Sequence, residues 1–128
     1  GSSRFRDAYI GQLESMIKLS KLPEAEKLGL ELLSNRDFKG ERGGRVYLLL
    51  GDLFVAKSKT GEKEENLRKA NGYYQNAYAR FKAFPEIAAT GLARSAVALD
   101  DLGETAAAVE VRKILEENPK FEKFRNVK

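Results

Sequence analysis

The chain has 128 residues, of which 42% are hydrophobic and 33% are charged, and its net charge is +4. This length and balance suit one folded domain with its own core and exclude a disordered acidic or basic tail. Cysteine and histidine are absent, which excludes disulfides, thiolate nucleophiles, a histidine base and the usual zinc ligands.

Residues 6–37 carry two apolar stripes whose spacings of three and four match the helical repeat. The stripes consist of Tyr9, Leu13 and Met16, and of Ala25, Leu28 and Leu32. A polar break at residues 20–21 separates them, and Pro23 follows, which is favoured in the first turn of a helix. The pattern predicts a helix, a tight turn and a second helix.

Residues 44–85 form the next predicted unit. Tyr47 is followed by the pair Leu50-Gly51 and then by Phe54. This arrangement resembles the first-helix signature of the tetratricopeptide repeat family, which has an aromatic residue, Leu-Gly, and then Tyr or Phe. A glycine inside a helix costs about 1 kcal/mol relative to alanine. We therefore expect Gly51 to lie where a neighbouring helix approaches closely.

The second half of this unit contains an apolar seam with helical spacing. The seam consists of Leu67, Ala70, Tyr74, Ala77, Phe81 and Phe84. Asn71-Gly72 lies inside it, and this pair is typical of a turn. Because the seam keeps its phase across the pair, it favours one long helix, straight or bent, over two short helices broken at Gly72.

Residues 86–119 form a third predicted hairpin. Its stripes consist of Leu92, Ala96 and Leu99, and of Ala107, Val111 and Ile114. Asn118-Pro119 predicts the end of the second helix, since the residue before a proline is biased away from helix. Phe121 and Phe124 in the remaining segment, 120–128, indicate a tail or a short capping helix.

The resemblance implies an all-α fold in which residues 1–128 form a single domain. We expect a right-handed α-α superhelix of helical hairpins, with six main helices and a short C-terminal helix. The chain departs from the family pattern in its first unit, where Gln12-Leu13 replaces Leu-Gly and Gly29 replaces a large residue. The middle unit is longer than the family repeat by about two helical turns.

No motif predicts catalysis. The glycine-rich segment 39–45, with Arg42 and Arg45, could hold an anion at a helix start, but a connection between hairpins is favoured because P-loop features are lacking. Adjacent carboxylates such as Glu64-Glu65 point about 100° apart on a helix and suit a solvated face. We expect no enzyme activity, catalytic residue, cofactor or metal, and no binding of nucleic acid.

In this family the inner helices line a concave groove that usually binds a peptide or helix of another protein. Carried over position by position, the resemblance implies a partner-binding site formed by Ile10, Glu14, Ile17, Arg45, Leu48, Asp52, Val55, Arg94 and Val97. Asp7, Thr90 and Ala93 occupy the remaining groove positions. The Lys/Asn/Arg clamp of one family subtype is absent, so the groove suits an amphipathic helix or an apolar segment better than an acidic tail.

The expected function is therefore a protein–protein interaction module or scaffold. The alternative is a self-assembly domain within a larger, membrane-anchored protein. No apolar run approaches the roughly 18 to 20 residues of a membrane span, so we expect a soluble fragment without direct membrane insertion, cytoplasmic or periplasmic. The opening Gly1-Ser2-Ser3, which lacks an initiator Met, is expected to be the remnant of a cleaved tag.

Overall fold

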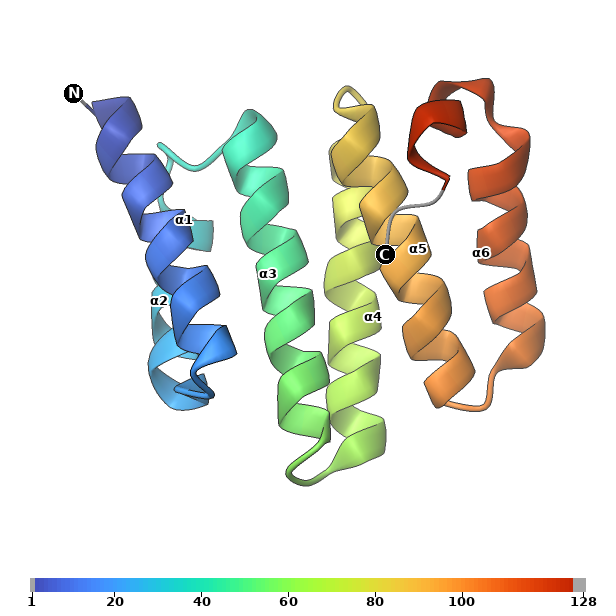
Figure 1. Ribbon diagram of the computed structural model, residues 1–128, viewed down its shortest axis with the longest axis horizontal. Helices are drawn as coiled ribbons and strands as arrows, with labels where there is room; N and C mark the ends of the chain where they lie inside the picture. The colour runs from blue at the N-terminus through green and yellow to red at the C-terminus, as the bar shows by residue number, and fades with distance from the viewer. Residues whose placement is uncertain (1, 126–128) are drawn as a thin grey trace.

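The computed structural model describes residues 2–125, which form six α-helices, a short 3₁₀ helix and no strand (Figure 1). The elements are α1 (Ser2–Lys18), α2 (Leu22–Ser34), α3 (Gly40–Ser58), α4 (Lys63–Arg80), α5 (Pro85–Asp101), α6 (Thr105–Glu117) and η1 (Pro119–Phe124). The predicted all-α class, with six main helices and a short C-terminal one, is confirmed for this part of the chain.

Prolines and glycines mark the helix ends as the sequence predicts. Pro23 and Pro85 each lie in the first turn of their helix, where the missing N–H has no intrahelical partner to lose. The turn between α5 and α6 contains Gly103 with a φ of 80°, a left-handed conformation that favours glycine. The helix α6 ends one residue before Asn118, whose side-chain oxygen accepts a hydrogen bond from the Lys120 N–H and starts η1.

Successive helices run in alternating directions, and their axes lie roughly across the longest axis of the molecule (Figure 1). The odd-numbered helices form a continuous row, because α1 contacts α3 and α3 contacts α5. Within residues 2–125, the even-numbered helices contact odd-numbered helices but not one another. The molecule therefore has one side built from α1, α3 and α5, and another on which α2 and α4 stand apart.

Two apolar clusters make up the core. The larger cluster is formed mainly by residues of the helices α1, α2, α3 and α4. It includes Ile10, Leu13, Val46, Leu50 and Leu53, each at most 1% exposed. The smaller joins α5, α6 and η1, where Phe121 of η1 is buried against the hairpin. The C-terminal segment thus contributes to the core.

Close helix contacts occur at glycines. A Cβ added to Gly51 would lie less than 3.0 Å from the Tyr74 ring of α4, so the predicted close approach at Gly51 is confirmed. A Cβ on Gly29 would lie 2.6 Å from Leu50, and one on Gly91 would lie 2.6 Å from the Tyr74 carbonyl oxygen. Gly29 therefore lets α2 approach α3 at the point where the family pattern has a large residue.

Four sequence predictions need correction. In α6, Ala107 and Ile114 of the predicted stripe are exposed, and the neighbouring Ala108 and Leu115 are buried in their place. Tyr9 is exposed, and the neighbouring Ile10 is buried in its place, because the buried face of α1 turns toward α3. The helix α3 begins at Gly40, ahead of residue 44, and Gly43 and Gly44 are buried helical residues, whereas a flexible connection was the expectation. The helix α4 is continuous through Asn71-Gly72, as favoured, but it ends at Arg80, before Phe81 and Phe84.

Candidate functional site

A cavity of about 160 Å³ opens on the side of the molecule formed by α1, α3 and α5. It is lined by Glu14, Arg45, Leu48, Leu49, Asp52 and Arg94. All of these except Leu49 belong to the predicted partner-binding set, so three separate helices bring five predicted residues together. We call this lining, together with Val97 one turn further along α5, the inner surface.

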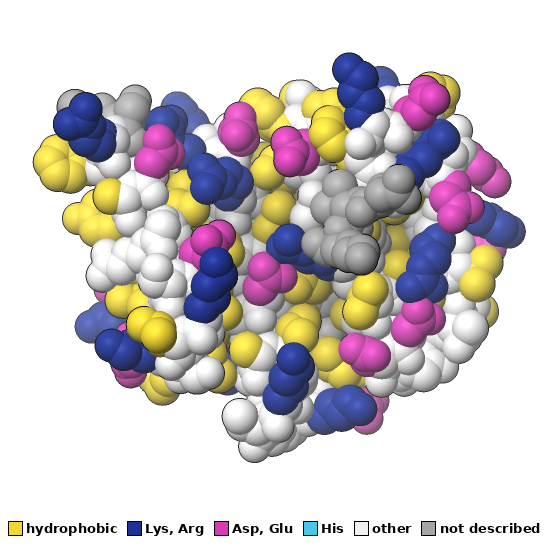
Figure 2. All heavy atoms as spheres, in the orientation of Figure 1, with side chains coloured by type: hydrophobic (Ala, Val, Ile, Leu, Met, Phe, Trp, Pro, Cys, Tyr) yellow, Lys and Arg dark blue, Asp and Glu magenta, His cyan; other side chains and the backbone are white. Residues whose placement is uncertain are grey.

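The charges on this side of the molecule are mixed. Figure 2 shows basic and acidic side chains interspersed over the face that carries α1, α3 and α5. At the edge of this face, the Arg42 Nε atom donates a hydrogen bond of 3.1 Å to Asp7 Oδ1, which ties α3 to α1. The surface is therefore neither a basic field for a nucleic acid nor an acidic one for a basic tail.

Asp52 is the centre of a polar network that joins three helices. Its Oδ1 accepts a hydrogen bond of 2.5 Å from the Tyr74 hydroxyl on α4. Its Oδ2 accepts one of 2.9 Å from Arg94 Nη1 on α5. Because both oxygens have donors, the carboxylate is held in one orientation at the base of the cavity.

The surroundings of Asp52 shift two ionisation equilibria. Burial raises the pKa of the Asp52 carboxyl above its ordinary value, and the charge of Arg94 and the Tyr74 hydrogen bond offset part of this shift. Burial, followed by the charge of Asp52, raises the pKa of Tyr74, so the phenol stays protonated at all ordinary pH values. Tyr74 is therefore a permanent hydrogen-bond donor to Asp52.

The predicted site residues differ in how accessible they are. Ile10 is 1% exposed and belongs to the core, so its assignment as a contact residue is wrong. Leu48 is only 8% exposed, and Ile17 and Val55 are half-buried against the same core. Val97 is 54% exposed, so its apolar side chain is accessible on the inner surface.

Tyr74 and Leu49 were not predicted from the sequence as parts of this site. Tyr74 belongs to the predicted apolar seam of α4, and the seam alone suggests nothing beyond packing. A buried tyrosine hydroxyl nonetheless needs a hydrogen-bond partner. Gly51 is predicted to lie where a neighbouring helix approaches closely. The adjacent Asp52 could therefore have been expected to accept a hydrogen bond from a tyrosine on that helix.

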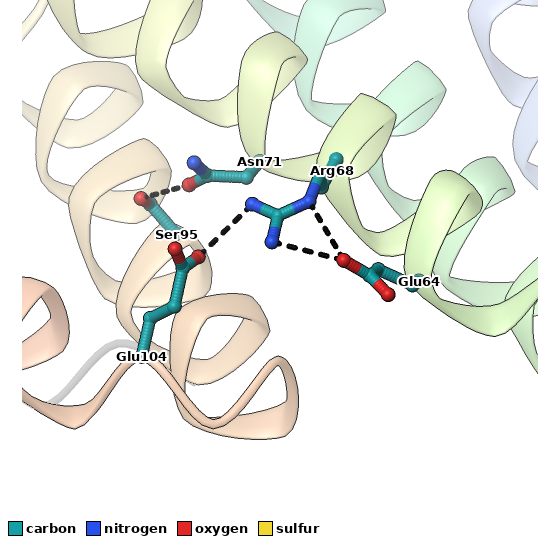
Figure 3. Close-up of polar contacts among 5 residues, drawn as sticks. All are labelled: Glu64, Arg68, Asn71, Ser95 and Glu104. Atoms are coloured by element: carbon teal, nitrogen blue, oxygen red, sulfur yellow. Dashed lines mark hydrogen bonds and ion pairs between the residues drawn. The ribbon is translucent and has the colours of Figure 1, made fainter.

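A second polar network lies between α4 and the last hairpin (Figure 3). Arg68 bridges Glu64 on its own helix and Glu104 before α6, each at 3.1 Å. The buried Ser95 hydroxyl donates to Asn71 and accepts from Gln75. Each of these side chains has a partner within the chain, so the contacts fasten α4 to α5 and to the turn before α6.

The described residues include no group of three or more acidic side chains placed to hold a metal ion. Within the same range, no helix combines the length and apolarity needed to cross a membrane. Comparison with protein-family models, with curated proteins and with solved structures finds no match to this chain.

Proposed function

We propose that this chain is a protein-binding module that holds a helix or peptide of a partner on its inner surface. In this proposal the hairpins stack in the right-handed superhelix typical of the tetratricopeptide repeat family. The continuous row of α1, α3 and α5 supports this arrangement, since such repeats place one helix of each hairpin along the inner wall.

The observation that carries the proposal is the convergence of α1, α3 and α5 on one cavity around Asp52. Its volume of about 160 Å³ falls below the roughly 300 to 1,000 Å³ of small-molecule sites, which favours a side chain of a larger partner as occupant. The lining contains Arg45 and Arg94 as well as Glu14 and Asp52, so a partner meets both signs of charge beside the apolar Leu48.

The network around Asp52 supports binding through preorganisation. Arg94 and Asp52 already hold each other in place, so a partner that contacts either group does not have to order it first. The exposed Val97 adds apolar area that becomes buried on binding. Apolar contact then supplies affinity, and the charged rim sets orientation and partner choice.

Site-specific photo-cross-linking tests the proposal. A photoreactive amino acid replaces Val97 in one sample and Val109 of α6 in the other. Both valines are about half exposed, at 54% and 45%, but only Val97 lies on the inner surface. We expect a discrete protein adduct from position 97 and none from position 109. The proposal fails if position 97 yields no adduct, or if both positions yield the same one.

A second candidate function, self-association, is favoured by one observation. Phe5 and Tyr9 lie one turn apart on α1, and both side chains are exposed. The helix α1, which carries both, lies at the opposite end of the molecule from η1 (Figure 1). Light scattering at two concentrations, on the wild type and on Tyr9→Glu, distinguishes the candidates. A dimer that Tyr9→Glu dissociates supports self-association, and a monomer at both concentrations rules it out.

A further inference from the structure

A groove separates α2 from α4 on the side of the molecule away from the inner surface. It has a volume of about 440 Å³ and is lined by Glu26, Leu30, Phe54, Lys69, Gly72, Tyr73 and Asn76. Residues 52 and 54 lie about 200° apart around α3, so Asp52 and Phe54 face opposite sides. We call this lining the outer groove.

The floor and walls of the outer groove are largely aromatic and aliphatic. The Phe54 and Tyr73 rings stack with centroids 5.6 Å apart and an interplanar angle of 11°. Leu30 on the opposite wall is 43% exposed. The helices α2 and α4 are not in contact, and the groove between them is lined by side chains from both.

Gly72 has no explanation within the chain. Gly29, Gly51 and Gly91 each lie where an added Cβ would meet a neighbouring helix. In contrast, a Cβ added to Gly72, in the middle of α4, would meet no other described helix within 4 Å, and the same holds for Gly11 of α1, but of these two only Gly72 lines the groove. Glycine lowers helix stability relative to alanine, and at Gly72 it leaves the groove wall open to the close approach of another backbone.

The charges around the groove favour an acidic group in whatever occupies it. The ammonium groups of Lys57 and Lys69 lie 4.9 and 5.5 Å from the centroid of the Phe54 ring. Lys57 is paired with Glu26 at 2.7 Å. Lys69 has only a pair of 3.5 Å with Glu65, in which both side chains are more than half exposed. A carboxylate from outside can therefore engage Lys69 at little cost to the chain.

We propose that the outer groove binds a helix of a partner protein, independently of the inner surface. The bound helix places a small residue against Gly72 and an apolar side chain between Leu30 and Tyr73. A glutamate or aspartate on the same helix lies beside Lys69. This is the helix-in-groove mode, in which glycine permits the two backbones to approach as they do at Gly91, where an added Cβ would lie 2.6 Å from the Tyr74 carbonyl oxygen.

The test uses a phage-displayed library of helical peptides of about 18 residues, the length of α4. The library is selected on the wild-type protein, and the tightest peptides are titrated by fluorescence anisotropy. The proteins compared are the wild type, Gly72→Leu and Gly11→Leu. Gly11 of α1 is the matched control, because an added Cβ there also meets open space and Gly11 does not line the groove.

We expect the selected peptides to carry apolar residues and a carboxylate on one face, and to bind Gly72→Leu about tenfold or more weakly. Gly11→Leu binds as the wild type does. We expect both variants to melt at or above the wild-type temperature, since an added Cβ at either position meets no other described helix, and thermal melts of both separate a loss of affinity from a loss of fold. Lys69→Glu also weakens binding, less so at high salt.

The inference is overturned if no peptide is selected, or if every selected peptide binds Gly72→Leu within about twofold of the wild type. Peptides that lose affinity for Val97→Glu and keep it for Gly72→Leu overturn it as well. That last result supports the inner surface, so the two proposals fail separately.

Discussion

Tyr73 and Tyr74 are adjacent on α4, yet they belong to the two different surfaces of the molecule. The Tyr74 hydroxyl crosses to the inner surface and donates to Asp52. The Tyr73 ring lies in the outer groove and stacks on Phe54. The inner surface is thus organised by hydrogen bonds and ion pairs, whereas the outer groove is organised by ring contacts.

This difference follows from how the helices are packed. On the inner side α1 and α5 each contact α3, and polar side chains of α3, α4 and α5 are paired around Asp52. On the outer side α2 and α4 are separated, and the aromatic residues of α3 and α4 fill only part of the gap. A partner at the inner surface therefore meets polar side chains that are already paired, whereas a partner at the outer groove meets aromatic and aliphatic side chains.

The largest expected effect comes from Gly51→Leu, which disrupts the α3–α4 contact that supports both surfaces. Even a Cβ at this position overlaps the Tyr74 ring, so the larger side chain forces that ring away from Asp52. We expect a loss of about 2 to 4 kcal/mol in the free energy of unfolding, measured by urea denaturation. A wild-type stability for Gly51→Leu contradicts the packing described for Tyr74.

The smaller substitution Gly51→Ala also destabilises the fold, by about 1 to 2 kcal/mol. From the sequence alone, this change is expected to be mild, because alanine favours helix. The position of the Tyr74 ring overrides that expectation, since the neighbour is a rigid ring held by its own hydrogen bond.

Tyr74→Phe weakens the inner surface alone. It removes one donor from the Asp52 carboxylate and leaves the ring in contact with Gly51. We expect a loss of about 1 to 2 kcal/mol in unfolding free energy. The control is Tyr9→Phe at an exposed position, which changes stability by less than about 0.5 kcal/mol. Equal effects of the two changes would show that the Asp52 hydrogen bond contributes nothing.

Gly72→Ala tests the openness of the outer groove. Because an added Cβ meets no described atom, the gain in helix propensity is not opposed by crowding. We expect the free energy of unfolding to rise by about 0.5 to 1 kcal/mol, in contrast to the loss at Gly51. A destabilised Gly72→Ala protein would mean that this part of α4 is packed against something within the chain.

The smallest effect is the pH dependence that Asp52 adds to stability. Its pKa is raised in the folded state, so folding binds the proton more tightly. The resulting stabilisation is complete below the unfolded-state pKa and is lost as the pH rises through the folded-state pKa. Relative to Asp52→Asn, the wild type therefore loses stability as the pH rises from the ordinary aspartate pKa of 3.8 through the raised folded-state pKa. If the wild type gains stability over that range, the Arg94 ion pair outweighs burial.

Much of the fold was accessible from the sequence because its signals are local. The stripe of Ala25 and Leu32 and the breaks at Pro23 and Pro119 place helices and their ends without knowledge of their neighbours. The contact at Gly51 was also predictable, because a glycine inside a helix needs a reason. Tyr9 and Ile10 were misassigned because adjacent residues differ by about 100° around a helix, and only the packing of α3 selects the buried one.

The candidate site was only partly predictable. Family positions give residues that share a side of the molecule, and they do bring Glu14, Asp52 and Arg94 to one cavity. They do not give depth, so they include Ile10, which is in the core. The outer groove was not predicted from the sequence, because it exists only where α2 and α4 do not contact each other. No stripe within a single helix carries that information.

The most direct test of the account is a calorimetric titration of the protein cross-linked at position 97, once identified, against surface variants. Val97→Glu changes the inner surface, Gly72→Leu changes the outer groove, and Val109→Glu changes neither. We expect Val97→Glu to weaken binding by about tenfold or more, while the other two variants bind as the wild type does. Undiminished affinity for Val97→Glu, together with a loss at Val109→Glu, would contradict the assignment of the inner surface as the binding site.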